Sequence, residues 1–308
     1  MKGFDSEKWK KELALIPELP ELKKRLDIFS QEAVNIPTDQ IQTEYNKACR
    51  IFPFGGTIIE PQVANSFSIF RVRKNLGEFE YPNLISNFSY PPSALCTWAG
   101  RANLKYRPVF YGAMEPETAL LECKPKLNDM LYLSVWGIDS DNSFIWSSLL
   151  PFDLPIENIW NQIAKKQKEN VDRQSKLAGV EKNKELKYLY ETTAKWFLLE
   201  DDGYTKSSWI SNKYLYGMTN VAVLAYPSIS TARKTTCLAI NPNFVDCYMK
   251  IKKTYMFDII KNKDQLAFRL QSVSNADTIN MNLGKPLEED YKFIESVLLK
   301  SEYQFQNE

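Results

Sequence analysis

Hydrophobic positions recur at helical spacing near both ends and in the middle of the chain. Residues 5–50 carry such stripes, and the prolines in this region predict several short helices rather than one long helix. Residues 155–200 form the longest block with this pattern, and a last helix is expected near residues 286–300. The positions that support these helices are Trp9, Leu13, Ile16, Leu22, Leu26 and Phe29, then Ile156, Ile159, Trp160, Ile163, Leu186, Leu189, Thr193, Trp196 and Phe197, then Leu287, Tyr291, Ile294 and Leu298.

Runs of β-branched and aromatic residues predict strands on both sides of the central helical block. In the first run, residues 67–74, the alternation of a strand puts Arg71 and Arg73 on the same side of the pleat. The other expected strands are residues 109–111, 130–138, 221–226, 237–240, 248–251, 255–260 and 266–272. Strands before and after a helical block favour an α+β fold over a doubly wound parallel sheet.

A short helix is expected directly after the strand at residues 109–111. Pro116 suits the first turn of a helix, because its missing N–H is not needed there. The following run ETALLE then places Thr118 and Glu122 one turn apart on one helix face.

The amino-acid composition restricts the chemistry that the chain can perform. There is no histidine, which excludes Ser-His-Asp and Cys-His catalysis as well as histidine-ligated zinc and haem. The five cysteines are scattered and form no C-x-x-C pair, so we expect reduced thiols rather than a disulfide framework or a zinc knuckle. The 39 basic residues nearly cancel the 38 acidic ones, so direct nucleic-acid binding is not expected.

The sequence also bears on the compartment in which the protein works. Charged residues interrupt the apolar positions of the N-terminus, so we expect no secretory signal. No run of about 18 apolar residues suggests a membrane span, and we therefore expect a cytoplasmic protein. Residues 165–187 are dense in Lys, Glu, Asn and Gln, which indicates a solvated helical face.

One set of residues carries a more specific signal. It consists of Arg71 in a strand, Arg101 in the loop Gly-Arg-Ala-Asn, Tyr111 at a strand end, Glu122 on a helix, and Ser228 in a distant Tyr-Pro-Ser. Their order and spacing resemble the RES domain family. The longest matching stretch is WAGRANLKYRPVFYGAMEPETALLE, and an Ile-Asn-Pro sequence follows downstream. The resemblance covers residues 67–245, interrupted by the central helical block.

This resemblance implies an ADP-ribosyltransferase-like RES β-sandwich core, to which the sequence adds N-terminal helices and a large helical insertion. The resemblance does not account for the N-terminal segment or for the tail beyond about residue 250. Residues 1–60 would form the N-terminal helical segment, and residues 61–275 the RES catalytic domain. That domain would include the insertion at residues 155–215, and residues 276–308 would form a C-terminal helix and tail. The family has an Asn where Thr236 and Cys237 are the nearest positions, and this sequence departs from the pattern there.

The resemblance also implies an activity. RES proteins are typically toxins of toxin–antitoxin pairs, and NAD is their substrate. They degrade it by hydrolysis or phosphorolysis, or transfer its ADP-ribose to a protein or metabolite. No metal is implied, an antitoxin or inhibitor protein is an expected partner, and a homo-oligomer remains open. A catalytically silent nucleotide-binding module is the alternative from a different class.

The residue types suit cleavage of the nicotinamide–ribose bond. Nicotinamide leaves as a neutral group from a cationic glycoside, so no acid such as histidine is needed to protonate it. Glu122 would stabilise the positive charge that develops on the ribose. Arg71 and Arg101 would bind the two phosphates, and Arg71 is also a candidate catalytic residue.

Tyr111 would stack on the nicotinamide or adenine ring, and the Ser228 hydroxyl would bond the ribose or the nicotinamide amide. Each of these residues also has a purely structural interpretation. Glu122 could be solvated, Arg71 paired with a surface carboxylate, Tyr111 part of the core, and Ser228 a turn hydroxyl.

Overall fold

The computed structural model describes residues 6–53, 55–78, 80–177, 181–199, 203–217, 221–262, 265–276 and 281–301. These residues form an α+β fold built on a mixed ten-stranded sheet, which confirms the predicted class. The strands are β1 (Thr57–Ile59), β2 (Ser68–Lys74), β3 (Phe110–Ala113), β4 (Met130–Ile138), β5 (Phe144–Ser148), β6 (Val221–Pro227), β7 (Thr236–Ile240), β8 (Met249–Asn262), β9 (Gln265–Ala276) and β10 (Met281–Gly284).

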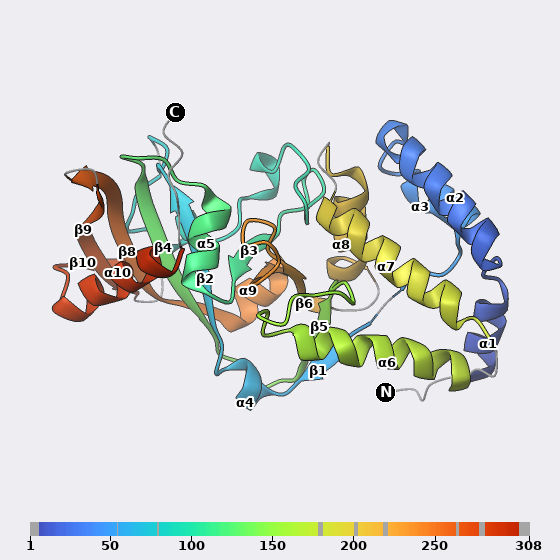
Figure 1. Ribbon diagram of the computed structural model, residues 1–308. Helices are drawn as coiled ribbons and strands as arrows, with labels where there is room; N and C mark the ends of the chain where they lie inside the picture. Colours follow the sequence, from blue (N-terminus) through green and yellow to red (C-terminus); the bar gives the residue numbers. More distant parts are fainter. Residues whose placement is uncertain are drawn as a thin grey trace.

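The helices lie mainly at one end and on one side of this sheet (Figure 1). They are α1 (Ser6–Ala14), α2 (Leu19–Glu32), α3 (Ile41–Ala48), α4 (Pro61–Ala64), α5 (Pro116–Cys123), α6 (Asn161–Leu177), α7 (Asn183–Leu199), α8 (Thr205–Leu215), α9 (Pro242–Tyr248) and α10 (Glu288–Ser301), with 3₁₀ turns η1 (Ala33–Asn35), η2 (Ile85–Phe88) and η3 (Ser93–Leu95). Proline occupies the first turn of α2, α4, α5 and α9, where its missing N–H costs nothing. None of the described helices combines the length and hydrophobicity needed to span a bilayer.

The sheet consists of two five-stranded halves joined at one point. Its strand order is β1-β5-β6-β7-β3-β2-β4-β8-β9-β10, and only the β5–β6 pair is parallel among these neighbours. β2 pairs with β4 along its whole length, but meets β3 only at Phe70 and Ala113. Gly112 permits this approach, because a Cβ there would lie 2.7 Å from Ile69 Cγ2.

The Phe70–Ala113 pair keeps both halves in one continuous sheet. The assignment of this core to an ADP-ribosyltransferase-like RES β-sandwich stays a prediction. The junction is nevertheless the feature that positions the candidate site.

The N-terminal helices pack on the central helical block. Leu22 and Leu26 of α2 share a hydrophobic cluster with Leu189 and Phe197 of α7 and with Leu224 of β6. This cluster supports one half of the sheet, and a separate cluster joins α10 to β8 and β9 at the other end. Figure 1 shows both helical regions at opposite ends of an elongated molecule.

Part of one predicted helical stripe is wrong. Ile156, Ile159 and Trp160 precede α6 instead of lying on it, and the two isoleucines are exposed. Asn158 holds this segment in a turn, because its Oδ1 accepts a 2.9 Å hydrogen bond from the backbone N–H of Trp160. The side-chain amide of Asn158 also donates to carbonyls of the 233–235 turn, at 2.9 and 3.0 Å. Side-chain capping thus prevents helix formation where the apolar spacing favoured it.

The strand predictions hold with changes in extent. Residues 248–251 and 255–260, expected as two strands, fall in the single strand β8, except that Tyr248 ends α9; β8 has an irregular register near Met256. The sequence pattern did not indicate β1, β5 or β10. β1 and β10 are short edge strands of three and four residues, too short for an alternating pattern to emerge.

Candidate functional site

A cavity of about 410 Å³ lies where the two halves of the sheet meet. It collects residues from β2, β3, β6 and β7, from α5, from the loop after η3 and from the start of α8. Its lining residues are Phe70, Arg71, Val72, Trp98, Gly100, Arg101, Asn103, Tyr111, Gly112, Ala113, Ala119, Glu122, Cys123, Tyr204, Tyr226 and Cys237. Four of the five predicted site residues therefore line one cavity, and the fifth, Ser228, contacts one of them directly.

Glu122 is held by Ser228. Glu122 stands in the last turn of α5 and is exposed, whereas Ser228 is fully buried in the turn after β6. The Ser228 hydroxyl donates a 2.5 Å hydrogen bond to Oε1 of Glu122. The backbone of Ser228 is itself fixed, since its N–H donates to Thr235 O at 2.9 Å and its carbonyl accepts from Arg233 N at 2.8 Å. A rigid turn thus orients a carboxylate at the edge of the cavity.

Two buried groups lie behind this carboxylate. Cys237 and Tyr226 line the cavity, and burial raises the pKa of each well above its ordinary value. The negative charge of Glu122 raises the pKa of the Cys237 thiol further. Burial also raises the pKa of the Cys123 thiol. All five cysteines are free, and the two in the cavity are held as neutral thiols rather than as nucleophilic thiolates.

Thr236 and Cys237, neighbours on β7, contact different parts of the structure. Thr236 is fully buried, and its hydroxyl donates to Oδ1 of Asn158 at 3.1 Å, away from the residues that line the cavity. Cys237, its neighbour, is the residue of this pair that lines the cavity.

Arg71 is a half-buried cation that has no carboxylate partner among the described residues. Its Nη1 donates to the carbonyl of Tyr111 at 2.8 Å, and its guanidinium lies 5.2 Å from the ring centroid of Phe110. Among the described residues, no acidic side chain forms an ion pair with Arg71, and its Nε has no hydrogen-bond partner. Burial lowers the pKa of Arg71 from 12.5 to about 10, helped by the nearby charge of Arg73. An anionic ligand in the cavity would relieve this cost.

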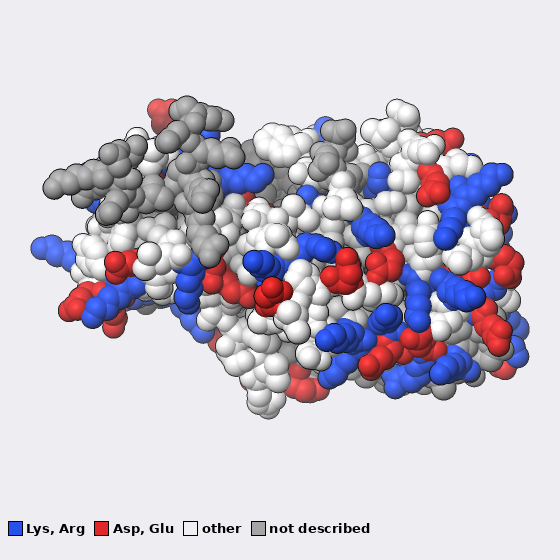
Figure 2. Space-filling model, in the orientation of Figure 1, with Lys and Arg blue, Asp and Glu red and all other residues white. Residues whose placement is uncertain are grey.

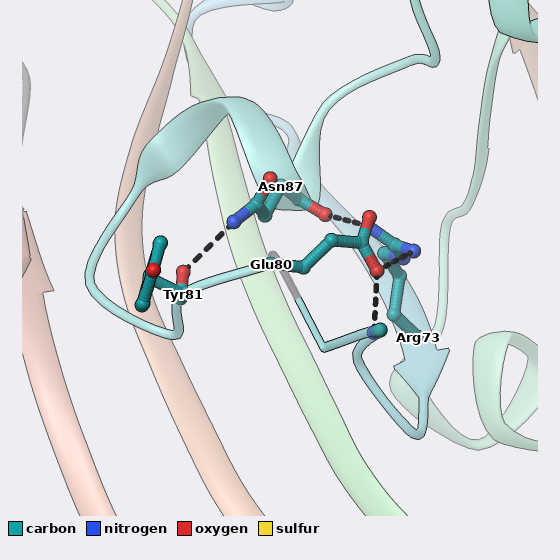
Figure 3. A network of polar contacts seen from close by, with 5 residues as sticks. Arg73, Glu80, Tyr81 and Asn87 are labelled. Carbon is teal, nitrogen blue, oxygen red and sulfur yellow. Dashed lines mark hydrogen bonds and ion pairs between the residues drawn. The ribbon is translucent and has the colours of Figure 1, made fainter.

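Arg73, two residues along the same strand, is in the opposite situation. Its guanidinium makes a bidentate ion pair with Glu80, with nitrogen–oxygen distances of 2.9 and 3.0 Å (Figure 3). Arg73 also donates to the carbonyl of Asn87, and Glu80 accepts from the N–H of Gly77 at 2.8 Å. This network folds the loop after β2 and uses the charge of Arg73 locally. Arg71 and Arg73 share a face of the strand, but Arg71 alone of the two is left for a ligand.

Arg101 lines the cavity but also anchors the helical block. Its Nη1 donates to the carbonyls of Phe197 and Leu198, both at 2.6 Å. These are among the last carbonyls of α7, which lack partners within the helix. The guanidinium also lies 5.5 Å from the ring centroid of Tyr204. One end of this side chain is therefore committed to structure, which the sequence did not indicate.

Tyr111 fixes the shape of the loop that carries Arg101. Its hydroxyl accepts from the N–H of Ala102 and donates to Oδ1 of Asn103, both at 2.8 Å. A Cβ at Gly100 would lie 2.5 Å from the same Oδ1, so this tight loop requires glycine. Burial raises the pKa of Tyr111, so the hydroxyl stays protonated and keeps its donor role. The ring still lines the cavity, where stacking on a ligand remains available.

Several lining residues were not among the predicted site residues, and four of them are Trp98, Asn103, Tyr204 and Tyr226. Trp98 is 76% exposed at the cavity. Tyr204 has a left-handed backbone, with φ of 54°, at the start of α8, and Asn103 organises the loop. Tyr226 belongs to the Tyr-Pro-Ser motif, which could have drawn attention to it. Nothing in the sequence pointed to Tyr204.

The charges elsewhere on the molecule are mixed. On the face drawn in Figure 2, Lys and Arg alternate with Asp and Glu over α6 and α7. Among the described residues, no three or more Cys, Asp or Glu side chains gather closely enough to hold a metal ion. No protein-family model and no curated protein sequence matches the chain.

Proposed function

We propose that the chain is an NAD-degrading enzyme of the RES type, with Glu122 as its catalytic carboxylate. The observation that carries this proposal is the cavity that holds Arg71, a cation without an acidic partner, together with Glu122, which Ser228 orients. The two phosphates of NAD are negative, so a carboxylate contributes nothing to binding that part of the dinucleotide, because like charges repel. A carboxylate is useful where positive charge develops during a reaction.

The proposed reaction breaks the bond between the nicotinamide nitrogen and the ribose. The bonding electrons leave with nicotinamide, which becomes neutral, and the ribose carbon gains positive charge. The Glu122 carboxylate stabilises this charge. A water molecule or a phosphate ion then forms the new carbon–oxygen bond. Hydrolysis yields ADP-ribose, nicotinamide and a proton, and phosphorolysis yields the phosphate ester of ADP-ribose and nicotinamide.

The remaining lining residues would bind and orient the dinucleotide. Arg71 supplies a desolvated positive charge for the phosphates, and Arg101 adds a second charge at the loop. Tyr111, Tyr204 and Trp98 provide aromatic faces for the nicotinamide or adenine ring. The high exposure of Trp98 supports a role at the mouth of the cavity, where the end of a long ligand would emerge.

A regulatory partner is part of this proposal. An enzyme that consumes NAD inside a cell must be restrained, and an inhibitor protein that places an acidic group against Arg71 would block the phosphate position. Expression of the chain alone in bacteria should then arrest growth and lower cellular NAD.

The fate of labelled NAD tests the proposed function. The purified chain is incubated with NAD labelled in the adenine ring, with and without phosphate and with a cell extract as a source of acceptors. Free labelled ADP-ribose, or its phosphate ester, is the expected product. Label on a protein or small acceptor would instead make the chain an ADP-ribosyltransferase. Intact NAD that remains bound would make it a nucleotide-binding module.

A further inference from the structure

A second cavity, of about 440 Å³, lies away from the candidate NAD site. It is enclosed by α4, β1, β5 and the beginning of α6, which lie side by side in the lower part of Figure 1. The lining residues on which the proposal rests are Phe67, Trp146, Trp160, Ile163, Lys166 and Asn170. This volume falls within the roughly 300–1,000 Å³ of ordinary small-molecule pockets. None of the proposed NAD-site residues contributes to it.

Aromatic rings form one wall of this second cavity. The indole rings of Trp146 and Trp160 are stacked, with an interplanar angle of 5° and centroids 5.8 Å apart. The ring of Phe67 stacks on Trp146 at 27° and 5.2 Å. The three rings form a nearly parallel column, which presents flat faces and edges to a ligand. Such a wall favours a planar aromatic group over a branched aliphatic one.

The polar groups of the cavity favour an anion. Lys166 is its single charged lining residue, and no acidic side chain lines it. Within the described residues Lys166 has no ion pair. Asn170 lies one helical turn further along α6, and its Oδ1 accepts from Arg173 at 3.0 Å, which leaves its amide N–H groups as donors. Two donors therefore stand on one face of α6 at the cavity.

A third donor lies within the aromatic wall. Trp146 is only 3% exposed, and its Nε1 has no hydrogen-bond partner among the described residues. A buried N–H without a partner is unfavourable, and a ligand acceptor would remove that cost. Ile159, at the rim of the cavity, is 64% exposed, so packing within the protein does not account for its apolar side chain. An apolar ligand would cover them.

We propose that this second cavity binds a planar aromatic monocarboxylate. Its ring would extend the column of Phe67, Trp146 and Trp160, and would lie against Ile163. Its carboxylate would meet Lys166 and Asn170 on α6. This proposal does not depend on the NAD-cleaving activity, because the two cavities share no lining residue.

Calorimetric titration of the full chain with 2-naphthoate tests the proposal. We expect saturable binding at one site per chain. The neutral analogue 2-naphthylmethanol should bind more weakly. Lys166→Gln should weaken 2-naphthoate binding about threefold, the size expected for an exposed charge pair. The matched control is Lys165→Gln, which removes a neighbouring charge outside the cavity and should leave binding unchanged.

Two further variants locate the site. Ile163→Trp should fill the cavity and abolish binding, and Val63→Trp does the same from α4 if the first variant fails to fold. Arg71→Ala should have no effect, because Arg71 belongs to the other cavity. The proposal is overturned if no saturable binding occurs at millimolar 2-naphthoate, or if both Trp variants fold and still bind it. Loss of binding in Arg71→Ala would also overturn it, since that places the ligand in the first cavity.

Discussion

The hydroxyl of Ser228 donates a 2.5 Å hydrogen bond to Oε1 of Glu122, across 106 positions of sequence. Ser228 is completely buried, so the bond originates in a rigid turn rather than on a mobile surface chain. The sequence analysis assigned the Ser228 hydroxyl to the ribose or the nicotinamide amide. The structure gives it a different partner, and Ser228 becomes the residue that orients the proposed catalytic carboxylate.

Removal of this hydroxyl should impair turnover more than binding. We expect Ser228→Ala to lower kcat for NAD cleavage about tenfold, with KM changed less than twofold, because the carboxylate loses its orientation but the phosphate contacts remain. The control is Ser296→Ala, which removes a hydroxyl that donates to Phe293 O within α10. Steady-state kinetics of both variants make the comparison, and an unchanged kcat in Ser228→Ala would contradict the positioning role.

Substitutions of the two arginines of β2 should change different properties. Loss of Arg71 should lower the affinity for NAD, and loss of Arg73 should lower the thermal stability. Arg71→Ala should weaken NAD binding at least about tenfold, because a desolvated charge contact to phosphate is lost. Arg73→Ala should leave affinity nearly unchanged but lower the melting temperature, because the partly buried bonds to Glu80 and Asn87 disappear. Calorimetry with NAD and thermal melting of both variants test this. The reverse assignment of effects would refute the phosphate role of Arg71.

The desolvated charge of Arg71 should also lower the free energy of unfolding of the wild-type chain. Its pKa falls from 12.5 to about 10 on folding because its charge is desolvated. The unfolded chain therefore holds this proton more tightly, and the cost is fully present below pH 10 and shrinks as the pH rises from 10 towards 12.5. At pH 7 we expect Arg71→Met to raise the free energy of unfolding by on the order of 1 kcal/mol, while NAD binding is lost. Denaturant unfolding measures the change, and a clear destabilisation would contradict it.

Substitution of Arg101 should lower both the stability of the fold and the affinity for NAD. Arg101→Ala removes the donor for the carbonyls of Phe197 and Leu198, so we expect a loss of about 1–2 kcal/mol in addition to weaker NAD binding. Arg101→Lys should restore part of each, because one ammonium group cannot reproduce the planar fork. Melting curves with and without NAD distinguish the two contributions. A fully stable Arg101→Ala variant would show that α7 does not need this anchor.

Local sequence signals predicted the elements that carry the site. Pro116 and the ETALLE run identified α5, and alternation in residues 67–74 put Arg71 and Arg73 on one face of β2. The sequence could not separate these two arginines, because the partner of Arg73 depends on how the following loop folds back to place Glu80. It also could not foresee the contribution of Tyr204, which depends on a left-handed backbone at that residue and on the approach of its ring to Arg101.

Long-range contacts also explain why the segment before α6 is not the helix that the sequence predicted. Helical spacing of Ile156, Ile159 and Trp160 is a local pattern, whereas the Asn158 amide bonds reach a turn 75 residues away. Long-range polar contacts decide such segments, and they leave no periodic trace in the sequence. Two of these residues, Ile159 and Trp160, line the second cavity instead.

Release of nicotinamide by the purified chain, compared between wild type and Glu122→Gln, tests the central claim most directly. Chromatographic quantification should show steady nicotinamide release by the wild type, and a rate about 100-fold or more lower in Glu122→Gln, because the stabilising charge is lost while the shape is kept. Calorimetry should show that the variant still binds NAD, and Glu117→Gln, which lies on α5 outside the cavity, should cleave normally. Equal release by wild type and Glu122→Gln, or no release by folded wild type, would contradict the account.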